Sequence, residues 1–140
     1  MKKILTILVI IAVLSPVISH AKTQSCPSQN FPIFLKAYQN NLDIQKKFTH
    51  YPLKSNSYYP DFAEKPTTSI LKAALIQFPI LMNQQDMKDQ AVELSIKKQT
   101  AHWYQVVTRN TGGTGADAFE YDFKKLSGCW QLVEVTDSST

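Results

Sequence analysis

Histidine is the side chain here best suited to acid–base or metal chemistry near neutral pH, and beyond residue 21 only His50 and His102 occur. Neither lies in a motif that ties it to a second reactive group. His50 follows a predicted helix, where a positive charge suits the helix dipole, and His102 stands beside aromatic residues in a predicted strand. Two histidines cannot form a histidine-rich zinc site, and no spacing indicates a mixed site with carboxylates. We therefore predict no metal, no cofactor and no catalytic set.

The segment 110–117, Asn-Thr-Gly-Gly-Thr-Gly-Ala-Asp, has the glycine content of a phosphate-binding loop. Such a loop needs a helix after it, so that backbone N–H groups converge on the phosphate, whereas a strand is predicted here. We interpret the segment as a long hairpin loop in which glycine supplies positive φ angles. An exposed loop of small residues can insert into a concave partner. The candidate partner-binding residues in it are Thr111, Gly112, Gly113, Thr114 and Gly115.

Tyr58 and Tyr59 are two further candidates for partner binding, because they flank a polar segment without a regular apolar period. A tyrosine ring with a polar tip contributes affinity at interfaces. A packed loop with satisfied hydroxyl groups explains them equally well.

The start of the chain predicts a secretory signal peptide over residues 1–21. Lys2 and Lys3 precede an apolar run from Ile4 to Leu14, and Ser19-His20-Ala21 supplies small residues for cleavage. The run is shorter than the roughly 20 residues of a membrane span, which disfavours an uncleaved anchor. The segment before Cys26 lacks the residues of a lipid-attachment site. We expect a periplasmic or secreted protein with no membrane span after cleavage.

Export makes pairing of Cys26 with Cys129 the preferred interpretation of the two cysteines. Disulfides form in oxidising compartments, and an even count allows a single intramolecular bridge. The alternative is a nucleophilic or redox cysteine, which would need a nearby positive charge and a partner such as histidine. Neither cysteine has such a neighbour in sequence, so we predict a structural disulfide between the two ends of the domain.

The remaining segment, 22–140, has the size of one domain. The whole chain carries a formal charge of +4, and loss of Lys2 and Lys3 reduces it to 4 − 2 = +2. The lysines are scattered and form no dense basic run, which disfavours nucleic acid as a partner.

The first half of the domain is predicted to be helical. Asn30 caps a helix with Pro32 in its first turn, and apolar residues at helical spacing follow to about Phe48. Those apolar residues are Phe31, Phe34, Leu35, Tyr38 and Leu42, with the polar Gln45 at the next position of the period. Tyr51-Pro52 ends this helix, because the residue before a proline avoids helical geometry. Residues 54–66 indicate a loop or a short edge strand.

A second helix is predicted after Thr67-Thr68-Ser69, with its apolar face at Ile70, Leu71, Ala74, Leu75 and Phe78. Residues 76–82 alternatively form a short buried strand, because periodicity cannot decide for a short apolar run. The helix-or-strand choice over residues 70–82 stays open.

From Ala91 the apolar period changes to two, which predicts strands with one buried face. The expected strands are 92–97, 102–108, 119–124 and 129–135, with a tight turn at 126–128. Short connections favour antiparallel hairpins. We expect an α+β domain with N-terminal helices packed on a curved, cone-like antiparallel sheet of about four strands.

Two stretches resemble secreted bacterial proteins of unknown function with a nuclear transport factor 2-like (NTF2-like), or cystatin-like, α+β fold. The first is Leu42-x-Ile44-Gln45-x-x-Phe48-x-x-x-Pro52-Leu53, and the second is Tyr121-x-Phe123-Lys124-Lys125-x-x-Gly128-x-Trp130-x-Leu132-Val133. Proteins of this fold include small-molecule isomerases and hydrolases, ligand-binding scaffolds and immunity proteins. In an enzyme resembling them, polar groups lie inside the cone, and the candidates here are His50, His102, Asp117 and Glu134.

Three functions follow as hypotheses. The first is an exported binding protein, not an enzyme, of the immunity or inhibitor type, whose partner is another protein such as an envelope-acting toxin. The second is a cone-shaped pocket that binds a small ligand or catalyses a reaction with an acid–base pair. The third is an envelope accessory or structural factor. A ligand-shaped cavity with an adjacent histidine and carboxylate would favour catalysis.

Overall fold

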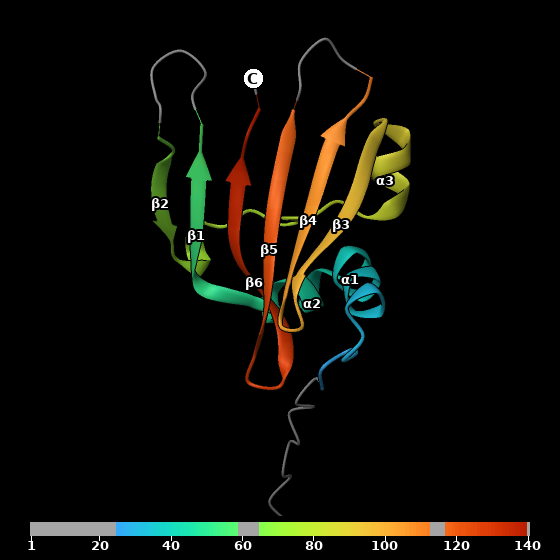
Figure 1. The fold of residues 1–140 in the computed structure, drawn as a ribbon, viewed down its shortest axis with the longest axis vertical. Coiled ribbons are helices and arrows are strands. Elements are labelled where there is room, and N and C mark those ends of the chain that lie inside the picture. The colour runs from blue at the N-terminus through green and yellow to red at the C-terminus, as the bar shows by residue number, and fades with distance from the viewer. Residues whose placement is uncertain (1–24, 59–64, 113–116, 140) are drawn as a thin grey trace, which may run out of the picture.

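The computed structural model describes residues 25–58, 65–112 and 117–139, so the predicted signal peptide over residues 1–21 lies outside it. Figure 1 shows a twisted sheet with the helices gathered toward the β3 side. The strands are β1 (Thr49–Ser57), β2 (Thr67–Leu71), β3 (Val92–Thr100), β4 (Trp103–Asn110), β5 (Ala118–Leu126) and β6 (Cys129–Asp137). The helices are α1 (Phe31–Asn40), α2 (Leu42–Lys47) and α3 (Gln84–Asp89), with one 3-10 turn, η1 (Ala73–Leu75).

The sheet has six strands in the order β2-β1-β6-β5-β4-β3, which corrects the expectation of about four. It is also mixed, because β1 runs parallel to β6 while the other neighbours are antiparallel. β1 lies in the interior of the sheet, between β2 and β6. The sequence predicts a loop or a short edge strand from residue 54, so this prediction is wrong for the part of β1 that begins there. Pro52 falls at the register shift between Thr49 and Lys54, where the ladder is interrupted and a missing N–H is tolerated.

The first helix is shorter than predicted, because Asn41 divides it. Asn41 has extended backbone angles (φ −142°, ψ 115°), and its side chain accepts hydrogen bonds from the N–H groups of Asp43 and Ile44. This local capping competes with continuation of α1 and starts α2 in a new direction. Leu42 is consequently 48% exposed and lies outside the core, whereas the sequence placed it on the buried stripe. The Asn30 cap of α1 is confirmed, since its side chain accepts from the N–H of Ile33.

The second predicted helix is wrong. Residues 67–71 form β2, which pairs with β1 from Ser57↔Thr67 to Leu53↔Leu71. Thr and Ile suit a pleated strand, so the threonines interpreted as a helix cap are strand residues instead. η1 follows, and residues 76–83 then cross the sheet in irregular conformation toward α3, neither helix nor strand (Figure 1).

The four strands predicted from the period of two are confirmed as β3 to β6. The tight turn between β5 and β6 is confirmed as well, with positive φ angles at Ser127 (48°) and Gly128 (80°). Glycine suits the second of these angles because it has no Cβ.

The core lies between α1, α2 and the lower half of the sheet in Figure 1, and it is largely aromatic. Phe31 of α1 stacks on Tyr104 of β4 with ring centroids 4.3 Å apart and meets Trp130 edge-on at 5.1 Å. Phe123 of β5 meets Tyr38 edge-on at 5.1 Å. These offset and edge-to-face arrangements are the favoured geometries of aromatic pairs.

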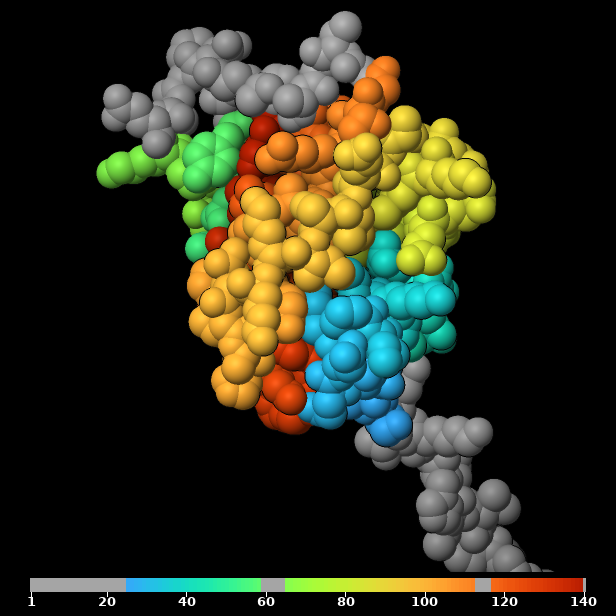
Figure 2. All heavy atoms as spheres, turned by 45° about the vertical axis from the view of Figure 1, so that its right-hand side comes forward, coloured from blue at the N-terminus to red at the C-terminus, as the bar shows by residue number. Residues whose placement is uncertain are grey.

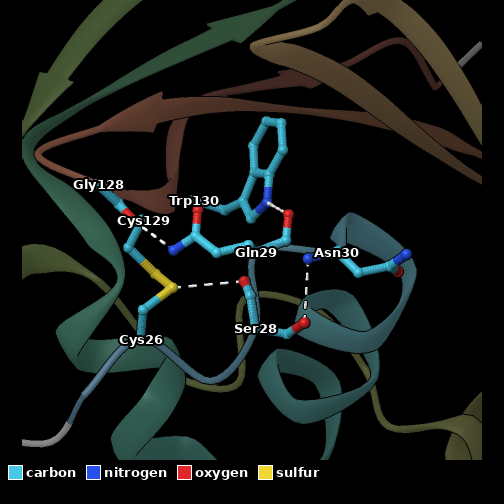
Figure 3. Close-up of a disulfide and its surroundings, with 7 residues drawn as sticks. All are labelled: Cys26, Ser28, Gln29, Asn30, Gly128, Cys129 and Trp130. Atoms are coloured by element: carbon cyan, nitrogen blue, oxygen red, sulfur yellow. Dashed lines mark hydrogen bonds between the residues drawn. A yellow bond between two sulfur atoms is a disulfide. The ribbon is translucent and has the colours of Figure 1, made fainter.

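The expected disulfide joins Cys26 to Cys129 across 103 residues (Figure 3). It fastens the segment before α1 to the start of β6. Gln29 reinforces the same junction with two hydrogen bonds. Its side-chain amide donates to the backbone carbonyl of Gly128 (2.6 Å), and its backbone carbonyl accepts from the indole N–H of Trp130 (3.0 Å). Among the described residues, the helices are all too short or too polar to cross a bilayer.

Candidate ligand-binding cavity

A cavity of about 360 Å³ lies between the sheet and the segment that leads from η1 into α3. Its apolar wall has contributions from the segment, from α3 and from strands β3, β5 and β6: Pro79, Ile80, Met82, Met87, Val92, Phe119 and Val135. Its polar groups are Gln90, Thr108, Asn110, Asp117 and Tyr121. Figure 2 shows α3 and the segment before it, in yellow, beside β3 and above the helices α1 and α2. An apolar cavity with a few convergent polar groups is the usual form of a small-molecule site.

Gln45 of α2 holds one wall of this cavity in place. Its side-chain amide donates to the carbonyl of Leu81 (2.7 Å), and its amide oxygen accepts from the N–H of Ile80 (2.8 Å). Gln45 is fully buried, so the two hydrogen bonds satisfy groups that water cannot reach. Gln39 of α1 adds a weaker contact by donating to the carbonyl of Met82 (3.3 Å). These side-chain hydrogen bonds hold the irregular segment in place, although it forms no backbone hydrogen-bond pattern of a helix or strand.

Tyr121 and Thr108 provide the innermost polar groups of the cavity, since both are buried while they line it. Burial raises the pKa of Tyr121, a hydrogen bond with the Thr108 side chain acts in the opposite direction, and the charge of Asp137 raises the pKa further. The net direction is upward, so the phenol stays protonated at neutral pH. It can therefore donate a hydrogen bond to a ligand.

Of the four acid–base candidates from the sequence, the structure places only Asp117 in the cavity lining. His50 lies on β1 with an exposed side chain, and His102 lies exposed in the turn before β4. The described lining therefore contains a carboxylate without a histidine beside it. An acid–base pair of the expected kind is not assembled there.

Glu134 lies on the opposite face of the sheet, because Val135 next to it lines the cavity and successive strand residues alternate. Its carboxylate pairs with Lys54 of β1 (3.0 Å) and accepts a hydrogen bond from the Asn56 side chain. Asp122 of β5 stands directly opposite Glu134, and its carboxylate accepts a hydrogen bond from the indole N–H of Trp103 (2.8 Å). Burial raises the pKa of Asp122, with a further upward contribution from Glu134 that the Trp103 hydrogen bond opposes.

The described candidates for partner binding lie at one end of the sheet but not together. Tyr58 follows β1 and is 43% exposed, and Thr111 and Gly112 follow β4. The strands β6 and β5 separate the two positions. Thr111 is held by its N–H and its hydroxyl group, which both donate to the carbonyl of Ala91 (2.9 and 2.8 Å). Gly113, Thr114, Gly115 and Tyr59 lie outside the described residues.

Several cavity residues escaped the sequence analysis. Gln45 carried one usable signal, a polar residue at a core position of an apolar stripe. Tyr121 was assigned simply to the core, and Thr108 to a strand, because no local pattern distinguishes a cavity wall from a filled interior. Among the described residues, no group of three or more histidine, cysteine, aspartate or glutamate side chains is placed to hold a metal ion.

The comparisons with known proteins bear on the fold. No known family matches the chain, and no curated protein is significantly similar to it. An NTF2-like protein from Bacteroides fragilis superposes with a TM-score of 0.57 at 14% identity, covering 84% of this chain and 50% of that one. A cystatin-like protein from Bacteroides caccae superposes with a TM-score of 0.50 at 15% identity, covering 81% and 79%. This chain thus spans half the length of the first of these proteins.

The described part of the chain has an NTF2-like α+β fold with a curved sheet, as the resemblance in sequence implied. At identities of 14% and 15%, the similarity shows a shared fold and does not show a shared function.

Proposed function

We propose that this protein binds a compact, largely apolar small molecule in the cavity between α3 and the sheet. The observation that carries the proposal is the cavity itself, about 360 Å³, with apolar walls and the Tyr121 and Thr108 side chains at its inner end. Small-molecule sites span about 300–1,000 Å³, so this volume suits a compact ligand rather than a long lipid chain. The NTF2-like superfamily includes both ligand-binding and enzymatic members. Among the described lining residues, one carboxylate stands without a histidine, which supports binding rather than acid–base catalysis here.

We also propose that the protein acts after export. The predicted signal peptide over residues 1–21 supports this, and so does the disulfide between Cys26 and Cys129, because such bonds persist in oxidising compartments.

Titration with a neutral apolar reporter, N-phenyl-1-naphthylamine, tests the binding proposal. We expect a blue-shifted increase in its fluorescence that saturates with the mature protein. Val135→Phe adds a ring to the cavity wall and should weaken reporter binding, whereas Ile70→Phe changes an exposed site on β2 and should not. Thermal melting of both variants controls for folding. Absence of a saturable signal, or equal affinity of the two folded variants, would contradict the proposal.

The immunity or inhibitor role stays a prediction. Shortening the loop over residues 111–116 would weaken binding to a protein partner under that hypothesis, while cavity variants would not. Recovery of the tagged mature protein, with mass spectrometry of what co-purifies, provides the partner for this comparison. The accessory or structural role also stays a prediction, and a stable oligomer or association with the cell wall is its measurable consequence.

A further inference from the structure

We propose that the cavity selects ligands whose polar end is neutral or positively charged and rejects ligands with an anionic end. This inference rests on the proposed binding function and specifies its ligand class. It concerns the sign of the charge around the cavity, which the lining side chains determine.

The charged group of the described lining is Asp117, which immediately precedes β5. Its carbonyl accepts from the N–H of Asn110, so the backbone pairing of β4 and β5 continues to this position and fixes where Asp117 stands. Among the described lining residues there is no lysine, arginine or histidine to neutralise it. A cationic group of a ligand can approach Asp117 with a charge-assisted hydrogen bond.

Asp137 adds a second negative charge near the same end. It stands opposite Phe119 in the pairing of β5 with β6, and Phe119 lines the cavity. Its charge reaches the inner polar group, since it contributes to the raised pKa of Tyr121. A ligand carboxylate would therefore be taken from water into a partly apolar cavity beside Asp117 and near the charge of Asp137, with no described basic side chain in the lining to compensate. An ammonium group also loses water, but its attraction to these carboxylates offsets that cost, and a hydroxyl group carries no charge to desolvate.

The net charge of the chain cannot account for a preference for cationic ligands, so that preference has to be a local property of the cavity. The chain carries a formal charge of +4, or +2 after loss of residues 1–21, and that overall charge attracts anions. If the overall charge decided affinity, an anionic ligand would bind best. Preference for a cation would have to come from the side chains at the cavity.

A matched set of probes tests the inference: 4-tert-butylbenzylamine, 4-tert-butylbenzyl alcohol and 4-tert-butylbenzoate, measured by isothermal titration calorimetry at pH 7. The three share one apolar body and differ in the charge of the polar end. We expect the amine to bind best, the alcohol next and the carboxylate weakest. Asp117→Asn should reduce the preference for amine over alcohol by about threefold, because Asp117 is exposed and water screens its contact with a cation. Asp43→Asn, an equal change of charge at the exposed start of α2, should leave the preference unchanged.

The outcomes separate this inference from the binding proposal. If N-phenyl-1-naphthylamine binds but the carboxylate equals or exceeds the amine, or the amine does not bind, the charge preference is wrong and the cavity remains a binding site. An equal effect of Asp117→Asn and Asp43→Asn would show that Asp117 acts only through the overall charge and makes no local contact with the ligand, which would also overturn the inference. If neither the reporter nor any of the three probes binds, the proposed function itself fails.

Discussion

The buried side chain of Gln45 hydrogen-bonds with the backbone on both sides of the peptide bond between Ile80 and Leu81. It accepts from the N–H of Ile80 and donates to the carbonyl of Leu81, and Leu81 is itself fully buried. The contact joins α2 to a segment 35 and 36 residues further along the chain. Because that segment has no regular secondary structure, the side chain of Gln45, with a weaker contact from Gln39, replaces the partners that a helix or strand would supply.

Gln45→Met should destabilise the protein by roughly 1 to 3 kcal/mol, because it leaves the buried carbonyl of Leu81 and the half-buried N–H of Ile80 without the Gln45 side chain. Methionine has nearly the same length, so the change removes hydrogen bonds more than volume. Urea unfolding measures the loss of stability. Gln77→Met, at an exposed position of the crossing segment, is the matched control and should have little effect. Equal stability of the two variants would show that the hydrogen bonds of Gln45 contribute nothing net.

Removal of the disulfide should reduce stability without abolishing the fold. In the chain-entropy model, a closed loop of about 100 residues contributes up to about 4.7 kcal/mol, and the bridge here spans 103 residues. The contacts of Gln29 with Gly128 and Trp130 remain when Cys26 and Cys129 are both replaced by serine. We expect a lower free energy of unfolding with an unchanged far-ultraviolet circular dichroism spectrum. Detection of two free thiols in protein isolated from the periplasm would contradict a structural role for the bridge.

Asp122→Asn should stabilise the protein slightly at neutral pH, by roughly 0.5 kcal/mol or less for a half-buried group near the surface. Burial and Glu134 raise the pKa of Asp122 in the folded state, so the folded protein binds this proton more readily than the unfolded chain does. Ionised Asp122 therefore destabilises the folded protein to its full extent at pH values above its raised, folded-state pKa. The destabilisation disappears below about pH 3.9, the ordinary pKa of aspartate, where the side chain is protonated in both states. Asparagine retains an acceptor for the indole N–H of Trp103.

The pH dependence provides the check on Asp122. The stability difference between Asp122→Asn and the parent should shrink as the pH falls from 7 to about 3. A double-mutant cycle with Glu134→Gln measures the repulsion across β5 and β6, since either change alone removes it. A stability difference that grows on acidification would show that the pKa of Asp122 is lowered in the folded protein.

Asn41→Ala should cost about 1 kcal/mol of stability, because the side chain of Asn41 caps α2. The neighbouring Asn40 is the control. Its side chain donates to the carbonyl of Lys36 at an exposed position of α1 and caps no helix start, so Asn40→Ala should cost less. Thermal melting of the two variants gives the comparison. A loss for Asn40→Ala that equals or exceeds the loss for Asn41→Ala would indicate that capping is not what Asn41 contributes.

The strands β3 to β6 were predictable because the information that specifies them is local. Val92 and Leu94 alternate with polar residues, as do Phe119, Tyr121 and Phe123, and short connections then lead to antiparallel pairing. The Asn30 cap with Pro32 is equally local. β1 and β2 were missed because their partners are distant: Lys54 pairs with Glu134, 80 residues away, and no local pattern encodes that pairing.

The sequence by itself determined the α+β class, the start of the first helix, four of the strands and the pairing of two cysteines, because each depends on neighbouring residues or on parity. The tertiary structure alone decided the mixed six-stranded sheet, the break at Asn41 and the cavity. The cavity exists where Asp117 and Val135 of one end of the sheet meet Met87 of α3 and Ile80 of the segment held by Gln45. A space between elements depends on how they pack in three dimensions, and periodicity along one element carries no record of it.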